Sequence, residues 1–407
     1  MRPGVDVISR ALPPPASAPT DTGVCFIVGA TTNTDTPYAL VHSLTEFVDT
    51  FGDRGSGASQ ATYDAVDVYF REGGSQCIVG STTSTAVFGR ADEEEAPAKK
   101  GKDAPEALVV DAGIANALAG LTADLGPGQI LIADATLAAV QANQSALLAH
   151  AAACNRVALL TCADGTAAQL QSAGQALQQD ANGRYGALFA PSAVVPGVVA
   201  GTTRTVPYSA VEAGIIARND LAYNPNQAAA GVLGQTLYAI DVNGRFSDLD
   251  YENLNNAGVN MARIIYGGVR TYGYRALVDP VAAPTWLDFG WARLNMAITA
   301  EAEAIGQAFV FSQLDGQRRT ISNFGGELAA MLNPFWASGA LYGTDPLKAY
   351  AVDVGVSVNT DATIANGELH AVLSVRMSGM SEWVEIEIVK VASNQSLPGT
   401  APAAIAA

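Results

Sequence analysis

Hydrophobic residues near the start of the chain form short apolar runs that are separated by segments with helical spacing. Residues 23–29 are an apolar run bounded by turn formers, which is typical of a buried strand. Helical spacing follows at 44–51 and 61–70, and Gly73-Gly74 ends the second helix. The run 77–80 predicts another strand. The pattern therefore indicates a compact unit of strands and helices.

The middle of the chain alternates more regularly. Apolar runs without polar alternation predict strands at 129–133, 157–160 and 185–190. Helical spacing predicts helices at 113–121, 137–152 and 166–178, and Pro207 opens a further helix that ends near Arg218. Strands that are apolar on both faces and separated by helices indicate a parallel sheet covered on both sides.

The C-terminal third has a different pattern. Apolar residues three and four apart predict two amphipathic helices at 291–309 and 321–335, the second closed by Gly339. Strict alternation then predicts three strands, at 350–358, 369–377 and 384–388, with a tight turn at Asn366-Gly367 before the second. This part is typical of an α+β arrangement.

The two ends of the chain are β-forming segments outside these units. Residues 1–8 include Val5, Val7 and Ile8 and precede a Pro-rich run at 13–19, and the last strand alternates over 383–391. Twenty extended residues reach up to roughly 70 Å. Such ends could add strands to a neighbour's sheet edge, or they could be a frayed terminus and an ordinary last strand. The residues expected to make intersubunit contacts are Val5, Val7, Ile8, Trp383, Val384, Ile386 and Ile388.

Composition and charge narrow the class of protein. The chain has 407 residues, of which 49% are hydrophobic and 15% charged, so it is globular and long enough for two or three domains. Its net charge of −17 disfavours nucleic acid or anionic lipid as a partner. No apolar run is long enough to span a membrane and no signal peptide is recognisable, so we expect folding in a cytoplasm. The mixed-charge segment 91–105 marks a break in composition and predicts a linker.

The sequence carries little recognisable chemistry. It contains no nucleophile elbow, no phosphate-binding loop and no dinucleotide-binding glycine pattern, so we expect neither a catalytic site nor a cofactor. The four cysteines are scattered and lie far from the three histidines, which argues against zinc and favours buried free thiols. We interpret His150 and His370 as structural. Asp134 and Asp164 follow strands, where a parallel sheet places ligand sites, but capping of the next helix is the simpler interpretation.

Several stretches spread over most of the chain resemble one protein family. They are Pro3-Gly4-Val5, the segment FIVGAT at 26–31, the segments 65–79 and 206–220, the segment at 258–277 that contains GVN and GVRTYGYRAL, and GALYG at 339–343. In this order they resemble the tail sheath proteins of contractile bacteriophages, R-type pyocins and related contractile injection machines. The chain departs from the family pattern at Tyr208 and Ala210, where the family has proline and glycine.

The resemblance implies a multidomain α/β and α+β fold. It implies a doubly wound middle domain that is subtilisin-like in shape but not catalytic, an α+β assembly domain formed by the N- and C-terminal parts, and extended terminal arms. The expected divisions are an arm at 1–22, assembly-domain parts at 23–90 and 276–381, a middle domain at 91–275, and a C-terminal arm and tail at 382–407.

The resemblance also implies a function and partners. The chain would be a virion tail sheath subunit, assembled in the host cytoplasm, that polymerises helically, as stacked hexameric rings, around a tail tube and contracts. Its partners would be its own copies, the tube protein, and baseplate and tail terminator proteins. Arg318 and Arg319 stand out as adjacent cations in an acidic chain and are candidates for contact with an acidic tube, although they could equally be a solvated first helical turn. The alternatives are an α/β hydrolase-like enzyme and another phage tail component with a sheath-like core.

Overall fold

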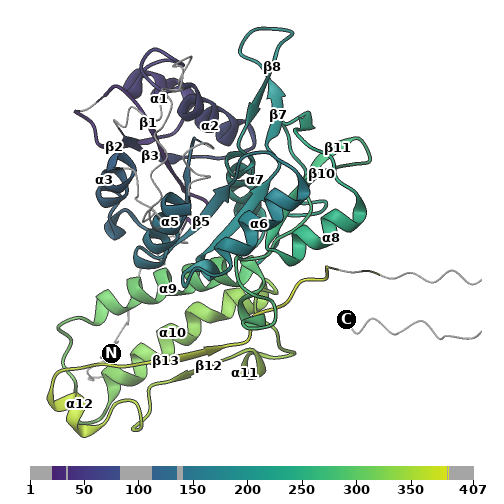
Figure 1. Ribbon diagram of the computed structural model, residues 1–407. Coiled ribbons are helices and arrows are strands. Elements are labelled where there is room, and N and C mark those ends of the chain that lie inside the picture. Colours follow the sequence, from purple (N-terminus) through teal and green to yellow (C-terminus); the bar gives the residue numbers. More distant parts are fainter. Residues whose placement is uncertain (1–20, 34, 83–111, 135–140, 383, 385–407) are drawn as a thin grey trace, which may run out of the picture.

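The computed structural model describes residues 21–33, 35–82, 112–134, 141–382 and 384. Figure 1 shows two parts: a large body, residues 21–288, in which helices flank a central sheet, and below it a C-terminal layer of two long helices and a pair of strands. The two parts follow the change of pattern that the sequence predicts in its C-terminal third.

The body is built around an eight-stranded sheet in the order β11-β10-β6-β5-β4-β1-β3-β2. Its strands are β1 (Cys25–Ala30), β2 (Tyr38–Val41), β3 (Cys77–Thr82), β4 (Gly128–Ile132), β5 (Arg156–Thr161), β6 (Gly186–Ala190), β10 (Val259–Ile265) and β11 (Gly268–Thr271). The inner strands are all parallel, and the edge strands β2 and β11 pair antiparallel with their neighbours. The predicted parallel sheet is confirmed.

Helices cover both faces because the inner strands bury residues on each side. Cys25 and Ile27 of β1 face one core cluster, whereas Phe26 and Val28 face the other. The first cluster includes residues of α1 (Leu44–Phe51), α2 (Gln60–Arg71), α7 (Tyr208–Ala222) and the start of α9 (Phe289–Phe309). The second includes residues of α3 (Ala112–Gly120), α5 (Gln141–Ala153), α6 (Ala167–Leu177) and α8 (Asp248–Asn256).

Short polar side chains begin several of these helices. The Ser43, Ser59 and Ser247 side chains accept hydrogen bonds from the backbone N–H groups of the first turns of α1, α2 and α8. Thr166 forms a reciprocal capping box with Gln169 at the start of α6. Each such cap stabilises a helix by about 1 kcal/mol.

The N-terminal strands β1, β2 and β3 pair within the body sheet, and the division of the chain into domains stays a prediction. β1 pairs in register with both β3 and β4, so that Cys25 lies opposite Cys77 on one side and Gln129 on the other. The linker predicted at 91–105 lies outside the described residues. The strands before and after it in the chain, β3 and β4, both pair with β1.

A small sheet on the body was not predicted. Its order is β8-β7-β9, with β7 (Ala193–Pro196), β8 (Thr203–Val206) and β9 (Asp241–Val242) all antiparallel. These strands have four residues or fewer, which is too short for a clear alternation. The β7–β8 hairpin projects from the top of the body in Figure 1.

The C-terminal layer confirms both predicted helices. α9 and α10 (Arg319–Ala337) pack together around Leu294, Ile298, Leu328 and Leu332, and Gly339 follows α10 with a φ of 82°. The strands β12 (Tyr350–Asp353) and β13 (Val372–Val375) are shorter than predicted, because the chain turns after Asp353 into the short helix α12 (Asp361–Ala365). The predicted strand at 384–388 lies outside the described residues except for Val384. The remaining short elements are α11 (Pro346–Ala349), η1 (Ala123–Leu125), η2 (Gly183–Tyr185) and η3 (Pro284–Trp286).

Candidate assembly surfaces

The strand pair β12–β13 is the first candidate surface. Tyr350 lies opposite Val375 and Asp353 opposite Val372, and the backbone N–H of Arg376 donates to the carbonyl of Ala349 at 2.9 Å. Within the described residues this sheet has only these two strands. A two-stranded sheet is marginal by itself, and a strand without a neighbour exposes N–H and C=O groups that can pair with another chain. The edges of this pair can therefore accept strands.

One face of the strand pair is held against the two long helices. Tyr350, Val352, Leu373 and Val375 pack on the core of the C-terminal layer and are half-buried, whereas the alternate residues are exposed. Helix α10 approaches closely at Gly325, where a Cβ would lie 2.7 Å from a methyl group of Val354. The strand pair is therefore held in place by packing against α9 and α10.

Most of the predicted strand-exchange residues cannot be placed. Val5, Val7, Ile8, Trp383, Ile386 and Ile388 lie outside the described residues. Val384 is described, and 73% of it is exposed. Their contacts with a neighbouring subunit stay a prediction.

The two candidate tube residues have different surroundings. Arg318 has a left-handed backbone (φ 59°) at the start of α10, and its guanidinium donates to the carbonyl of Asn359 at 2.9 Å. Asn359 is buried and holds the turn after β12 through hydrogen bonds to Val354 and His370. Arg319 is exposed. The sequence suggested an equivalent pair, whereas Arg318 ties α10 to the strand pair and Arg319 is the more available for a partner.

A buried ion pair and several amide hydrogen bonds join the C-terminal layer to the body. Arg293 of α9 is fully buried, and its guanidinium donates to the Asp220 carboxylate of α7 at 2.6 Å and to the Tyr274 hydroxyl at 3.1 Å. Asn226 donates to the carbonyls of Ala340 and Ser378 at 3.2 and 2.9 Å. Because these contacts are buried or partly buried, they fix the layer relative to the body.

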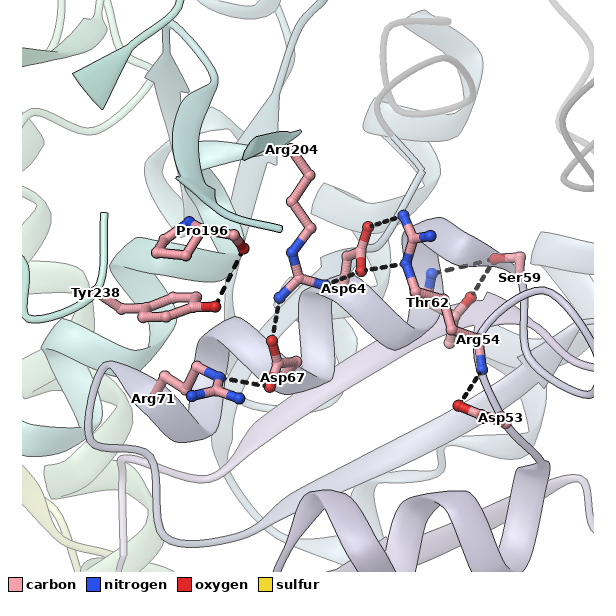
Figure 2. Close-up of polar contacts among 10 residues, drawn as sticks. All are labelled: Asp53, Arg54, Ser59, Thr62, Asp64, Asp67, Arg71, Pro196, Arg204 and Tyr238. Atoms are coloured by element: carbon pink, nitrogen blue, oxygen red, sulfur yellow. Dashed lines mark hydrogen bonds and ion pairs between the residues drawn. The ribbon is translucent and has the colours of Figure 1, made fainter. Parts of the chain in front are cut away.

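A second ionic network holds the β7–β8 hairpin on the body (Figure 2). Arg204 of β8 bridges Asp64 and Asp67 of α2, whose side chains are only 7% and 4% exposed. Asp64 also accepts two hydrogen bonds from Arg54 at 2.8 and 2.9 Å, and Asp67 accepts one from Arg71 at 2.7 Å. Each buried carboxylate is therefore shared between two guanidinium groups.

The same helix region anchors the loop before β9. Glu72 is buried, and its carboxylate accepts hydrogen bonds from the backbone N–H groups of Leu237, Tyr238 and Ala239 at 2.7, 2.9 and 3.1 Å. Burial raises the pKa of Glu72, and these three donors oppose that rise. The acidic residues of α2 and its C-cap thus connect the small sheet to the body.

A further buried carboxyl lies between α7 and β11. Glu212 is fully buried and accepts a hydrogen bond from the Thr271 hydroxyl, which lies 3.1 Å from the Tyr208 hydroxyl. Burial raises the pKa of Glu212 to about 8, although the Thr271 bond acts in the opposite direction. This carboxyl is a source of pH-dependent stability.

The residues that could suggest an enzyme have structural contacts. The Asp164 carboxylate accepts hydrogen bonds from the Ser192 backbone and the Asn243 side chain at 2.8 and 2.7 Å. Thr166 caps α6 in its place, which corrects the capping prediction for Asp164. His150 lies 2.9 Å from the Arg156 guanidinium, and burial lowers its pKa to about 4.

The sequence also led us to expect free buried thiols, no zinc site and no membrane-spanning segment. All four cysteines are free, and Cys25, Cys77 and Cys162 are buried. Among the described residues, no group of three or more His, Cys, Asp or Glu side chains could hold a metal ion. The described helices include none that is long and apolar enough to cross a membrane.

The residues that form these ionic and hydrogen-bond networks were not predicted from the sequence. Arg204 and its partners are 137 to 140 positions apart, and no local pattern connects them. The one available signal was the pair Asp64 and Asp67, which lies among the apolar residues of the helix predicted at 61–70. Buried acidic side chains need cationic partners, so that pattern predicts distant arginines without identifying them.

Comparison with known proteins identifies the fold. Neither a family model nor a curated protein matches the sequence. A chain in the contracted sheath complex of PVC, an extracellular contractile injection system, matches with a TM-score of 0.69 and 17% identity over 97% of this chain and 99% of that one. A chain in the contracted helical sheath of the anti-feeding prophage matches with a TM-score of 0.68 and 19% identity, covering 96% and 99%. The sheath tail protein from Desulfitobacterium hafniense matches with a TM-score of 0.56 and 10% identity, covering 86% and 93%. This chain therefore has the fold of contractile sheath proteins.

The network in Figure 2 predicts the effect of removing Arg204. Arg204→Met leaves two nearly buried carboxylates with one cation each, so we expect the free energy of unfolding to fall by about 2 kcal/mol. Urea unfolding of the unassembled subunit measures this. Arg245→Met is the matched control, because Arg245 pairs with Asp241 at the surface, and it should cost less than about 0.5 kcal/mol. Equal effects of the two variants would contradict the structural role of the network.

The raised pKa of Glu212 predicts a pH-dependent stability. A folded-state pKa of about 8, above the ordinary 4.5, gives a contribution that is complete below pH 4.5 and is lost as the pH rises through 8. The free energy of unfolding of the native chain, minus that of Glu212→Gln, should fall by at least about 1 kcal/mol between pH 5 and pH 8.5. Urea titrations at both pH values test this, with Glu252→Gln as an exposed control on α8. A pH-independent difference for Glu212→Gln would show that its carboxyl ionises freely.

Proposed function

We propose that this chain is the subunit of a contractile sheath, which polymerises helically around an inner tube and shortens to drive that tube through an envelope. The proposal depends on the structural matches to chains of contracted sheaths, which cover nearly all of this chain and nearly all of each matched chain. If the proteins shared only one domain, part of one chain would stay unmatched.

The comparisons favour one kind of machine among several. The matches to the anti-feeding prophage and PVC chains have TM-scores of 0.67 to 0.69, against 0.56 and 0.57 for the sheath tail proteins from Desulfitobacterium hafniense and Listeria innocua. We therefore propose the sheath of an injection-system particle, assembled in a cytoplasm, in preference to a phage tail that ejects a genome. One match lies in a baseplate structure of the anti-feeding prophage, which supports baseplate contact. The tube and terminator proteins would complete the set of partners.

Strand exchange would connect the subunits. In this proposal, residues 1–12 and 383–391 of one subunit add strands to the β12–β13 pair of a neighbour. Within the described residues no third strand pairs with β12 or β13, and Val384 is exposed; both observations support this proposal. The spacer at 13–19 is Pro-rich, which suits a semi-rigid connection.

Contraction would need no energy-consuming site. The extended sheath would be a metastable lattice formed during assembly, and contraction would move near-rigid subunits to a lattice with more buried contact. The buried ion pairs that fix the C-terminal layer and the hairpin to the body support rigid-body motion. The terminal segments would act as hinges, and the body, which we propose is a subtilisin-like fold without catalysis, would gain neighbours.

The two alternative functions have less support. An α/β hydrolase would need a catalytic set, and Asp164 and His150, which lie near the strand ends, have structural contacts. Another tail component with a sheath-like core would match over the core alone, whereas the matches extend over 96–97% of this chain.

The strand-exchange proposal predicts the effect of deleting residues 1–20. We expect a folded, monomeric subunit that does not form sheaths, because in this proposal the deleted segment contacts only neighbouring subunits. Circular dichroism reports folding, and sedimentation with electron microscopy reports assembly. Full-length sheaths from the truncated protein would refute this mechanism of connection.

The different surroundings of the two arginines predict different effects of charge reversal. Arg319→Glu should weaken association with an acidic tube protein while empty sheaths still form, because Arg319 is exposed. Arg318→Glu should instead destabilise the subunit, because it removes the donor to Asn359. Co-sedimentation with the tube and thermal unfolding separate the two outcomes. Normal tube binding by Arg319→Glu would remove this residue from the interface.

A further inference from the structure

The chain that leaves β13 runs back onto the body as an extended strap, residues 376–382. It passes the start of α9 and rises along the flank of the body toward α8, as the yellow-green segment in Figure 1 shows. It joins the C-terminal layer to the segment that we propose exchanges with a neighbour. Its contacts therefore determine where that segment leaves the subunit.

The first anchor of the strap is Ser378. Its backbone N–H donates to the carbonyl of Ala340 at 2.9 Å. Its own carbonyl accepts hydrogen bonds from the Trp291 indole at 2.8 Å and from the Asn226 side chain at 2.9 Å. Both backbone polar groups of Ser378 are thus bound within the subunit.

The second anchor is Met380, two residues further along. Its side chain is half-buried against the main core cluster of the body. Asp288, which caps α9, lies beside it: burial raises the pKa of the Asp288 carboxyl to about 7, and the backbone N–H of Met380 acts in the opposite direction. The spacing of two residues is that of an extended chain with one face toward the body.

The third anchor is Glu382, again two residues further. The Arg275 guanidinium makes a two-pronged contact with its carboxylate, with Nε 2.9 Å from Oε1 and Nη2 on Oε2. Arg275 is itself held from α8, because Nη1 donates to the carbonyl of Asn255 at 3.3 Å and to the Asn256 side chain at 3.2 Å. Its side chain is only 14% exposed, whereas that of Glu382 is 48% exposed.

The anchoring stops at this point. Continuing the spacing of two would place Val384 against the body, but 73% of Val384 is exposed. The ion pair of Arg275 with Glu382 is therefore the last contact with the body among the described residues at this end of the chain. A bidentate guanidinium–carboxylate pair fixes direction as well as distance.

We propose that Arg275 is a positioning residue for assembly: by holding Glu382, it fixes the point and direction from which the chain beyond residue 382 departs toward a neighbouring subunit. The strap stays on its own subunit in every state of the sheath, and the hinge begins after Glu382. This inference rests on the proposed sheath function.

Reversing the charges of this ion pair, singly and together, tests the proposal in the full-length chain. The variants are Arg275→Glu, Glu382→Arg, the double variant with both changes, and Glu382→Gln as the mildest change. Arg263→Glu and Asp248→Arg are matched controls, because this pair also joins the β10–β11 region to α8 but does not touch the strap. The readouts are amide hydrogen exchange of residues 377–382 in unassembled subunits and the protein concentration at which half of the subunits sediment as sheaths.

Each single change at Arg275 or Glu382 should accelerate amide hydrogen exchange in the strap and raise the half-assembly concentration by about tenfold, with unchanged hydrogen exchange in β4 and β5. The double variant Arg275→Glu/Glu382→Arg should restore both values to within about threefold of the native chain, and the control variants should leave both unchanged. Glu382→Gln that assembles like the native chain with an unaltered strap would overturn the proposal, as would a double exchange that restores neither value. If the native chain makes no sheaths, the proposed function fails. The rate of amide hydrogen exchange in the strap then still decides whether Arg275 holds Glu382.

Discussion

A buried ion pair between Arg293 and Asp220 holds the two parts of this subunit together. Arg293 lies on α9, the first long helix of the C-terminal layer, and Asp220 lies on α7, which packs against one face of the body sheet. Removing one partner of such a pair typically costs about 3–5 kcal/mol, because the other charge stays buried without compensation. The strand pair that we propose accepts neighbouring strands is therefore fixed in orientation to the body, and a displacement of one must carry the other.

The same principle applies at the opposite end of the body. Arg204 fixes the projecting hairpin to α2 through two nearly buried carboxylates, and Glu72 fixes the following loop through three backbone N–H groups. Packed cores held in this way do not deform continuously. In a sheath built from such subunits, the change in lattice would take place between subunits and in the terminal segments, and the last fixed point of the C-terminal segment would be Glu382.

The sequence predicted the helices and the inner strands because their periods are long and regular. The apolar runs at 23–29 and 157–160 and the helical spacing at 44–51 correspond closely to β1, β5 and α1. The order of strands in the body sheet could not be predicted, because strand order in a parallel sheet is independent of chain order. The ionic contacts could not be predicted, since Arg204, Arg275 and Arg293 find partners 73 to 140 residues away. The adjacent arginines 318 and 319 show the same limit, because only the fold reveals that the first is committed to Asn359.

If this chain forms the proposed sheath, contraction would be driven by energy stored in the lattice. Electron microscopy can test this on particles assembled from the protein on their tube, before and after brief heating or acid treatment without nucleotide. We expect long hollow cylinders that shorten and widen irreversibly, with an unchanged fold inside each subunit. Uniform small particles at high protein concentration, shortening only after nucleotide is added, or re-extension on cooling would contradict it.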